Sequence, residues 1–116
     1  MVDWDTVRAL ALALPEAEED ALQSRPAFRV RGKLFVWMSP HKEAAGALVV
    51  RADPEEKHLL LESNPDVYYT TPHYEKWAGV LIRPERIEPE ELRERIEDSW
   101  LLVAPKRVAR AFLAED

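Results

Sequence analysis

The stretch "RPAFRVRGKLFVWM", residues 25–38, decides the fold, because apolar and basic residues alternate on both sides of a glycine. A period of two is typical of a β-strand, and Gly32-Lys33 suits a two-residue hairpin turn that begins with glycine. This register sets Phe28 opposite Trp37, and opposed residues share a face. The side chains predicted on the buried face are those of Phe28, Val30, Phe35 and Trp37.

The other face of this predicted hairpin mixes basic and apolar side chains. Its members are Arg25, Arg29, Arg31, Leu34, Val36 and Met38. The arginine stems can simply cover their apolar neighbours while the charged ends stay in water. The same arginines can instead form part of an anion-binding surface. The residues of the hairpin alone leave both interpretations open.

Outward from the hairpin, helix starts, prolines and apolar periodicity predict the remaining elements. These are a helix from Asp3 to Pro15, an acidic loop at 16–20, strands at 47–51, 67–69 and 80–83, a helix capped by Asp53, a helix from Pro89, and a last helix after Pro105. The predicted fold class is α+β. We expect a compact single domain over residues 1–116, with a mainly antiparallel β-sheet and helices packed on one of its faces.

Composition excludes several classes of protein. The chain has 116 residues, a formal net charge of -6 and no cysteine, which excludes disulfides and thiolate chemistry. No apolar run is long enough to span a bilayer, and the first residues lack the pattern of a signal peptide. We expect a cytoplasmic protein with no membrane contact.

The charge is unevenly distributed along the chain. Residues 23–51 carry six basic side chains against one acid, whereas the segments on either side are acidic. A local basic patch can bind a polyanion even when the whole protein is negative. The candidate residues in this segment are Arg25, Arg29, Arg31 and Lys42.

The segment "TTPHYEKWAG", residues 70–79, gathers aromatic side chains behind a proline. Aromatic rings of this kind can stack on nucleic-acid bases. They can also close the edge of a domain while their polar atoms reach backbone or water. We interpret Trp77 as a structural plug, whereas His73 and Tyr74 remain candidates for a binding surface.

Lys106 and Arg107 are the remaining basic candidates. They stand at the predicted start of the last helix, where positive charge opposes the helix dipole. Either they cap the end of the preceding helix near Val103, or they bind an anion.

Catalytic and metal-binding patterns are absent from the sequence. The three histidines show no metal-ligand spacing, and the chain has no nucleophile motif and no glycine-rich phosphate loop. The acidic run at 16–20 is typical of a solvated loop rather than of a cation site. We therefore predict no catalytic residue, no metal and no cofactor, and an enzyme with the segment at 70–79 as its site is the last of three interpretations.

Four phrases carry a resemblance to the MmcQ/YjbR-like proteins. They are "LALALPEAEE", "RPAFRVRGKLFVWM", "PHYEKWAGV" and "SWLLVAPKRVARAF", in the order and spacing of that family. The resemblance implies a frataxin-like or double-wing α+β fold and a DNA-binding role. Some branches of the family carry a second histidine in the loop, where this chain has Lys76, so a role for paired histidines there is not implied.

These observations predict a nucleic-acid-binding module that contacts DNA or another polyanion through a local basic face. The alternative is a non-enzymatic domain that binds a protein or a small ligand.

Overall fold

The protein is built on one six-stranded antiparallel sheet, seen in a computed structural model that describes residues 2–114. The strands are β1 (Ala17–Leu22), β2 (Arg25–Val30), β3 (Lys33–Met38), β4 (Leu48–Arg51), β5 (Tyr68–Tyr69) and β6 (Gly79–Ile82). Their order across the sheet is β1-β2-β3-β4-β6-β5, and every neighbouring pair is antiparallel. The predicted α+β class and the antiparallel sheet are confirmed.

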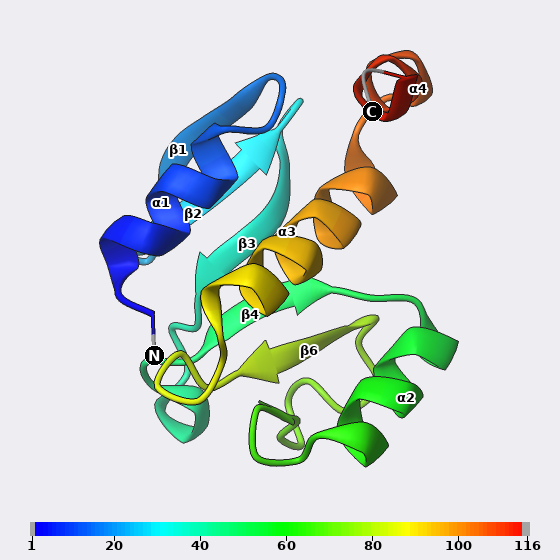
Figure 1. Cartoon of the computed structure of the whole chain (residues 1–116). Helices are drawn as coiled ribbons and strands as arrows, with labels where there is room; N and C mark the ends of the chain where they lie inside the picture. Colours follow the sequence, from blue (N-terminus) through cyan, green and yellow to red (C-terminus); the bar gives the residue numbers. More distant parts are fainter. Residues whose placement is uncertain (1, 115–116) are drawn as a thin grey trace.

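Helices gather on one face of the sheet. They are α1 (Trp4–Leu12), α2 (Pro54–Ser63), α3 (Pro89–Val103) and α4 (Lys106–Ala114). Figure 1 shows α1 and α3 side by side in front of the sheet, with α2 at its β6 end. Leu92, Ile96 and Trp100 of α3 have no exposed surface, and they form the main core with the strands beneath. The predicted packing of helices on one face is confirmed.

Two helix starts use the capping residues that the sequence offered. The Asp3 carboxylate accepts a hydrogen bond from the Thr6 backbone N–H at 2.9 Å, and Asp53 accepts one from the Glu56 N–H at 2.8 Å. Pro54 occupies the first turn of α2, where a missing N–H costs nothing. Within residues 2–114, none of the helices has the length and apolarity needed to cross a membrane.

The turn of the β2–β3 hairpin lies one residue earlier than predicted. Val30 pairs with Lys33, so the turn residues are Arg31 and Gly32, with φ angles of 50° and 82°. Two left-handed residues match the twist of the flanking strands, but arginine seldom takes such a φ, which explains the wrong prediction. The Arg29 guanidinium donates to the Gly32 carbonyl at 2.9 Å and helps to hold this turn.

A β-bulge at Phe35 separates the two halves of the hairpin. Arg29 pairs with Leu34 and Phe28 pairs with Val36, which leaves Phe35 without a partner on β2. Phe35 and Val36 are consequently both buried in the core under the helices, although they are adjacent in sequence.

The bulge also corrects the predicted face of Trp37. Trp37 pairs with Ala27 rather than with Phe28, and both lie in a second apolar cluster on the opposite side of the sheet. The predicted alternation holds for Phe28 and Val30, which are fully buried in the main core. It fails beyond Phe35, because one extra residue moves every later side chain to the other face.

Ser99 of α3 satisfies the backbone groups at the bulge. Its hydroxyl donates to the Phe35 carbonyl and accepts from the Arg51 backbone N–H at 2.8 Å. The Ser99 side chain is fully buried. One hydroxyl group therefore connects α3 with β3 and with the end of β4.

The acidic run forms an edge strand, whereas the sequence predicted a solvated loop. Ala17 pairs with Val30 and Leu22 pairs with Arg25, so β1 lies along the whole of β2. Glutamate and aspartate are poor strand formers, which is why the sequence predicted a loop here. Pairing with the arginines of β2 offsets this preference, and the charged side chains protect the free edge from further strand pairing.

We expect Ser99→Ala to lower the free energy of unfolding by about 1–3 kcal/mol, because the Phe35 carbonyl and the Arg51 N–H lose a buried partner. Urea denaturation of the variant measures this loss. Ser63→Ala is the matched control, since Ser63 is exposed at the end of α2. Equal stability of both variants would contradict this account of the bulge.

Candidate ligand-binding site

The sheet face opposite the helices is covered by two connections, residues 39–47 and residues 70–78. A second apolar cluster packs beneath them and includes Trp37, Val49 and Leu81. A pocket of about 230 Å³ opens beside this cluster, and we call it the aromatic pocket. It is lined by Leu22, Gln23, Trp37, Pro40, His41, His73, Tyr74 and Trp77.

Five rings of the aromatic pocket contact one another. The centroids of His41 and His73 lie 3.7 Å apart, and the Tyr74 ring is nearly perpendicular to both. Trp77 meets Trp37 edge-on at 5.4 Å. His41 belongs to the connection at 39–47, whereas His73 belongs to the connection at 70–78. The fold therefore gives His73 a second imidazole as a neighbour, although Lys76 stands where some branches of the family carry the second histidine. The rings offer flat surfaces to a planar ligand group.

Buried hydrogen bonds fix the base of the pocket. The Tyr74 hydroxyl lies 3.0 Å from Ser39 Oγ, and Ser39 has no exposed surface. The contact between Tyr74 and Ser39 ties the two connections together, and Ser39 Oγ also accepts from the His41 backbone N–H of its own connection at 3.3 Å. Tyr74 is buried and anchors the loop, whereas His73 is exposed at the rim.

Trp77 is mostly buried, in agreement with the plug that the sequence predicted. Its indole lies directly over Gly79: a Cβ added there would sit 1.9 Å from the ring and 2.5 Å from the Val50 carbonyl oxygen. The Arg51 guanidinium lies over the Trp77 ring, 5.6 Å from its centroid, in a cation–π contact. Trp77 thus combines a structural contact with an exposed edge on the pocket.

Lys57 of α2 holds the loop from its other side. Its ammonium donates to the carbonyls of Tyr74 and Glu75 at 2.9 Å each and to that of Trp77 at 2.6 Å. Burial lowers the pKa of Lys57, and the carboxylate of Glu75 opposes this shift. A charge that is taken out of water in this way needs the three carbonyl partners.

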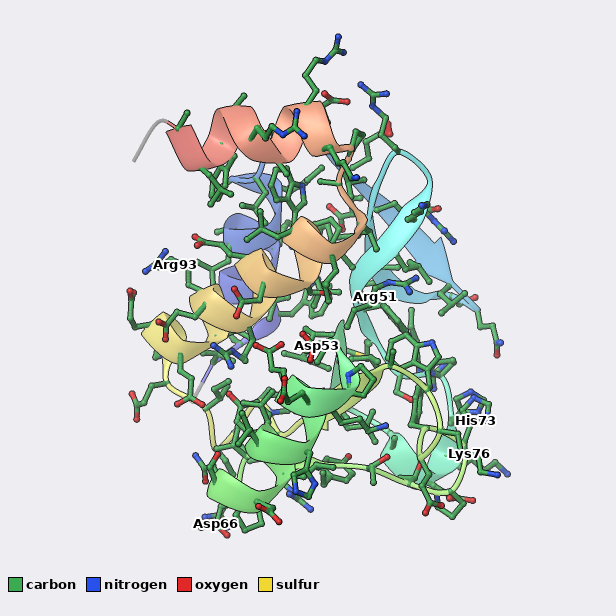
Figure 2. All side chains as sticks on the ribbon, turned by 90° about the vertical axis from the view of Figure 1, so that its right-hand side faces the viewer. Arg51, Asp53, Asp66, His73, Lys76 and Arg93 are labelled. Carbon is green, nitrogen blue, oxygen red and sulfur yellow. The ribbon has the colours of Figure 1, made fainter. Side chains whose placement is uncertain are left out.

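Three cations lie on the chain segments that line the aromatic pocket, although none of them is itself a lining residue, and Lys76 lines the neighbouring hollow beside Lys57. Arg25 pairs with Leu22, a pocket residue, and adjacent members of such a pair share a face. Lys42 follows His41 in the chain, and Lys76 precedes Trp77. Figure 2 shows His73 and Lys76 projecting at the same margin of the molecule. Among residues 2–114, none of these three cations forms an ion pair.

Arg29 and Arg31, which the sequence placed on the same basic face, are paired with acids of the β1 region. Arg29 contacts Asp20 at 2.8 Å, and Arg31 contacts Glu16. The hydrogen bond from Arg31 lowers the pKa of Glu16, and those from the Ala21 N–H and from Arg29 lower that of Asp20. The structure thus neutralises much of the basic segment internally.

Lys106 and Arg107 lie at the far end of the molecule from the pocket. Arg107 lines a separate hollow with Pro15 and Glu16, beside α4. Of the eight candidate residues, four gather around the aromatic pocket and four gather near β1, the hairpin turn and α4. Around the pocket are Arg25, Lys42, His73 and Tyr74, and at the other end are Arg29, Arg31, Lys106 and Arg107.

Sequence reasoning missed Trp37, His41 and Lys57 as parts of the site. Trp37 was assigned to the core because the bulge has no sequence signal, and His41 lies in a connection far from His73 in the chain. Lys57 reads as an ordinary exposed residue of an amphipathic helix. Within residues 2–114, no three histidine or acidic side chains are grouped so that they can hold a metal ion.

The family model YjbR matches residues 12–102, which include the sheet, α2 and nearly all of α3. The chain belongs to the YjbR family. Full-length relatives are the uncharacterized proteins Rv2570 of Mycobacterium tuberculosis (strain ATCC 25618 / H37Rv) and Mb2600 of Mycobacterium bovis. Each is 33% identical over 129 residues, which cover 98% of this chain and 98% of the relative.

A solved structure has the same fold as this YjbR-family protein. The crystal structure of Deinococcus radiodurans protein DR2400, described by the family-model domain DUF419, matches with a TM-score of 0.75. The match covers 91% of this chain and 81% of that one, at 22% identity. It confirms the fold, and the match to the family model confirms the resemblance that the sequence carried.

Gly79→Ala tests whether the Trp77 indole packs directly on Gly79. We expect a loss of about 1–3 kcal/mol in unfolding free energy and a change in tryptophan fluorescence, because the new methyl group displaces the indole. In a Trp77→Leu background the same substitution should cost less, because only the clash with the Val50 carbonyl oxygen remains, and this double-mutant cycle measures the coupling. Additive effects of the two substitutions would show that Trp77 does not pack on Gly79.

Glu16→Gln combined with Asp20→Asn tests the internal neutralisation. We expect stronger binding of duplex DNA at low salt, measured by fluorescence anisotropy, because Arg29 and Arg31 become free to contact phosphates. Glu55→Gln with Glu94→Gln makes the same change in net charge away from the hairpin and serves as control. Equal gains for both double variants would mean that the ion pairs mask nothing.

Proposed function

We propose that this YjbR-family protein binds single-stranded nucleic acid, with one base in the aromatic pocket and the neighbouring phosphates at Arg25, Lys42 and Lys76. One observation carries the proposal: an aromatic pocket of about 230 Å³ lies beside chain segments that carry Arg25, Lys42 and Lys76, and within residues 2–114 none of these three cations forms an ion pair. Aromatic faces bind bases and cations bind phosphates, and single-strand sites combine the two.

The size of the pocket supports a single strand rather than a duplex. Binding sites for whole small ligands usually measure about 300–1,000 Å³, so a hollow of about 230 Å³ suits one ring system. A base in a duplex is stacked and paired, and it must be flipped out at a cost before it can enter such a pocket. An unpaired base has no such cost.

The charge of the protein supports weak binding that is confined to one side. With a formal net charge of -6, most of the surface repels a polyanion. Three phosphate contacts to a single strand correspond to a salt slope of about -2 in the logarithm of the binding constant. Stacking on the rings adds a contribution that salt does not screen.

A salt titration with a labelled oligothymidylate of about twelve nucleotides, followed by anisotropy, tests the proposal. We expect the single strand to bind more tightly than the duplex of equal length. Replacing Arg25, Lys42 and Lys76 together by Gln should bring the salt slope close to zero. His73→Ala should weaken binding at every salt concentration, because it removes a stacking surface.

Lys106→Gln with Arg107→Gln is the matched control, since it removes exposed positive charge at the other end of the molecule. We expect it to leave the salt slope unchanged. A slope that falls with this control and not with the pocket variants would move the binding surface to α4. No binding of either nucleic acid at low salt would refute the proposal.

A site for a small planar anion is the second candidate, because the pocket accommodates only one ring system. Thymidine monophosphate should then bind as tightly as the oligonucleotide. Under the first proposal the mononucleotide binds more weakly, since it offers one phosphate to three cations.

A further inference from the structure

Three backbone carbonyls of the connection at 70–78, which we call the aromatic loop, converge on the side chain of Lys57 in α2. The carbonyls belong to Tyr74, Glu75 and Trp77, and the Lys57 ammonium lies 2.6–2.9 Å from each of their oxygens. An ammonium group has three N–H donors, so every donor is used. Lys57 is buried, with 9% of its surface exposed.

The loop needs such a partner because it has little regular structure of its own. Within it, Trp77 N–H donates to the Tyr74 carbonyl at 3.0 Å and Gly79 N–H donates to the Trp77 carbonyl at 2.9 Å. These turns point several carbonyl dipoles toward one place. A positive charge at that place stabilises the arrangement, and hydrogen bonds from a charged donor are stronger than neutral ones.

The same residues that receive the ammonium carry rings of the aromatic pocket. Tyr74 and Trp77 line the pocket, whereas Lys57 does not and instead lines the hollow on the other side of the loop. Lys57 can therefore affect the pocket only through the backbone that it holds.

We propose that Lys57 is the positioning residue of the aromatic pocket, and that its ammonium keeps the loop in the one conformation that arranges the rings for a ligand. This inference rests on the proposed function for its binding readout. The arrangement of the loop itself is measurable in the free protein, so the two ideas fail separately.

Chemical rescue provides the test. Lys57→Ala removes the ammonium and leaves space for a small amine, and we expect oligothymidylate affinity to fall by about tenfold or more. Amide hydrogen exchange at Trp77 and Gly79 should be faster in Lys57→Ala than in the wild type, while exchange in β3 and β4 stays slow. Propylammonium chloride should restore both affinity and protection, because it offers three N–H donors on a short stem.

Two controls separate positioning from general stability. Lys57→Met retains the packing of the stem and fills the space, so it should show the same losses without rescue. Tetramethylammonium chloride at equal concentration matches the ionic strength and has no N–H donor, so it should restore nothing.

The outcomes distinguish the hypotheses. Unchanged loop exchange in Lys57→Ala, or uniform acceleration across the sheet without rescue, would overturn the positioning role. If the wild type binds no oligonucleotide, the proposed function fails, and loop exchange with and without propylammonium still decides the role of Lys57.

Discussion

The β-bulge at Phe35 is the constraint on which the rest of the structure depends. It allows Phe35 and Val36 to enter the same core, and it turns Trp37 to the opposite face. Without it, the floor of the aromatic pocket would lack its central indole. The bulge frees backbone groups that must find other partners, and the Ser99 hydroxyl meets that requirement from α3.

Electrostatics divides the molecule into two ends. Near the hairpin turn, acids of the β1 region neutralise arginines that the linear sequence presents as a basic cluster. Around the aromatic pocket, Arg25, Lys42 and Lys76 keep their charge available. A charge count along the chain cannot distinguish these situations, because ion pairing depends on which strands are neighbours.

The loop over the pocket is held by polar contacts as well as by the second apolar cluster. Tyr74 is tied to Ser39 on one side, and Lys57 binds three carbonyls on the other. Contacts of this kind are directional, so they fix one conformation of a segment that has no helix or strand. This explains how a loop without regular secondary structure can present a defined surface.

The sequence by itself determined the fold class, the helix starts at Asp3 and Asp53, and the strand character of residues 25–38, because capping and apolar periodicity are local properties of the chain. It also placed His73 and Tyr74 among the candidates, since aromatic residues behind a proline are visible without a structure. Only the tertiary structure decided the register of the hairpin, the strand formed by the acidic run, and the meeting of His41 with His73. The physical reason is that each of these depends on a partner distant in the chain. Arg31 takes a left-handed conformation in the turn of a hairpin that the sheet holds in place, acids form a strand beside arginines, and two imidazoles meet where two connections cross one sheet face.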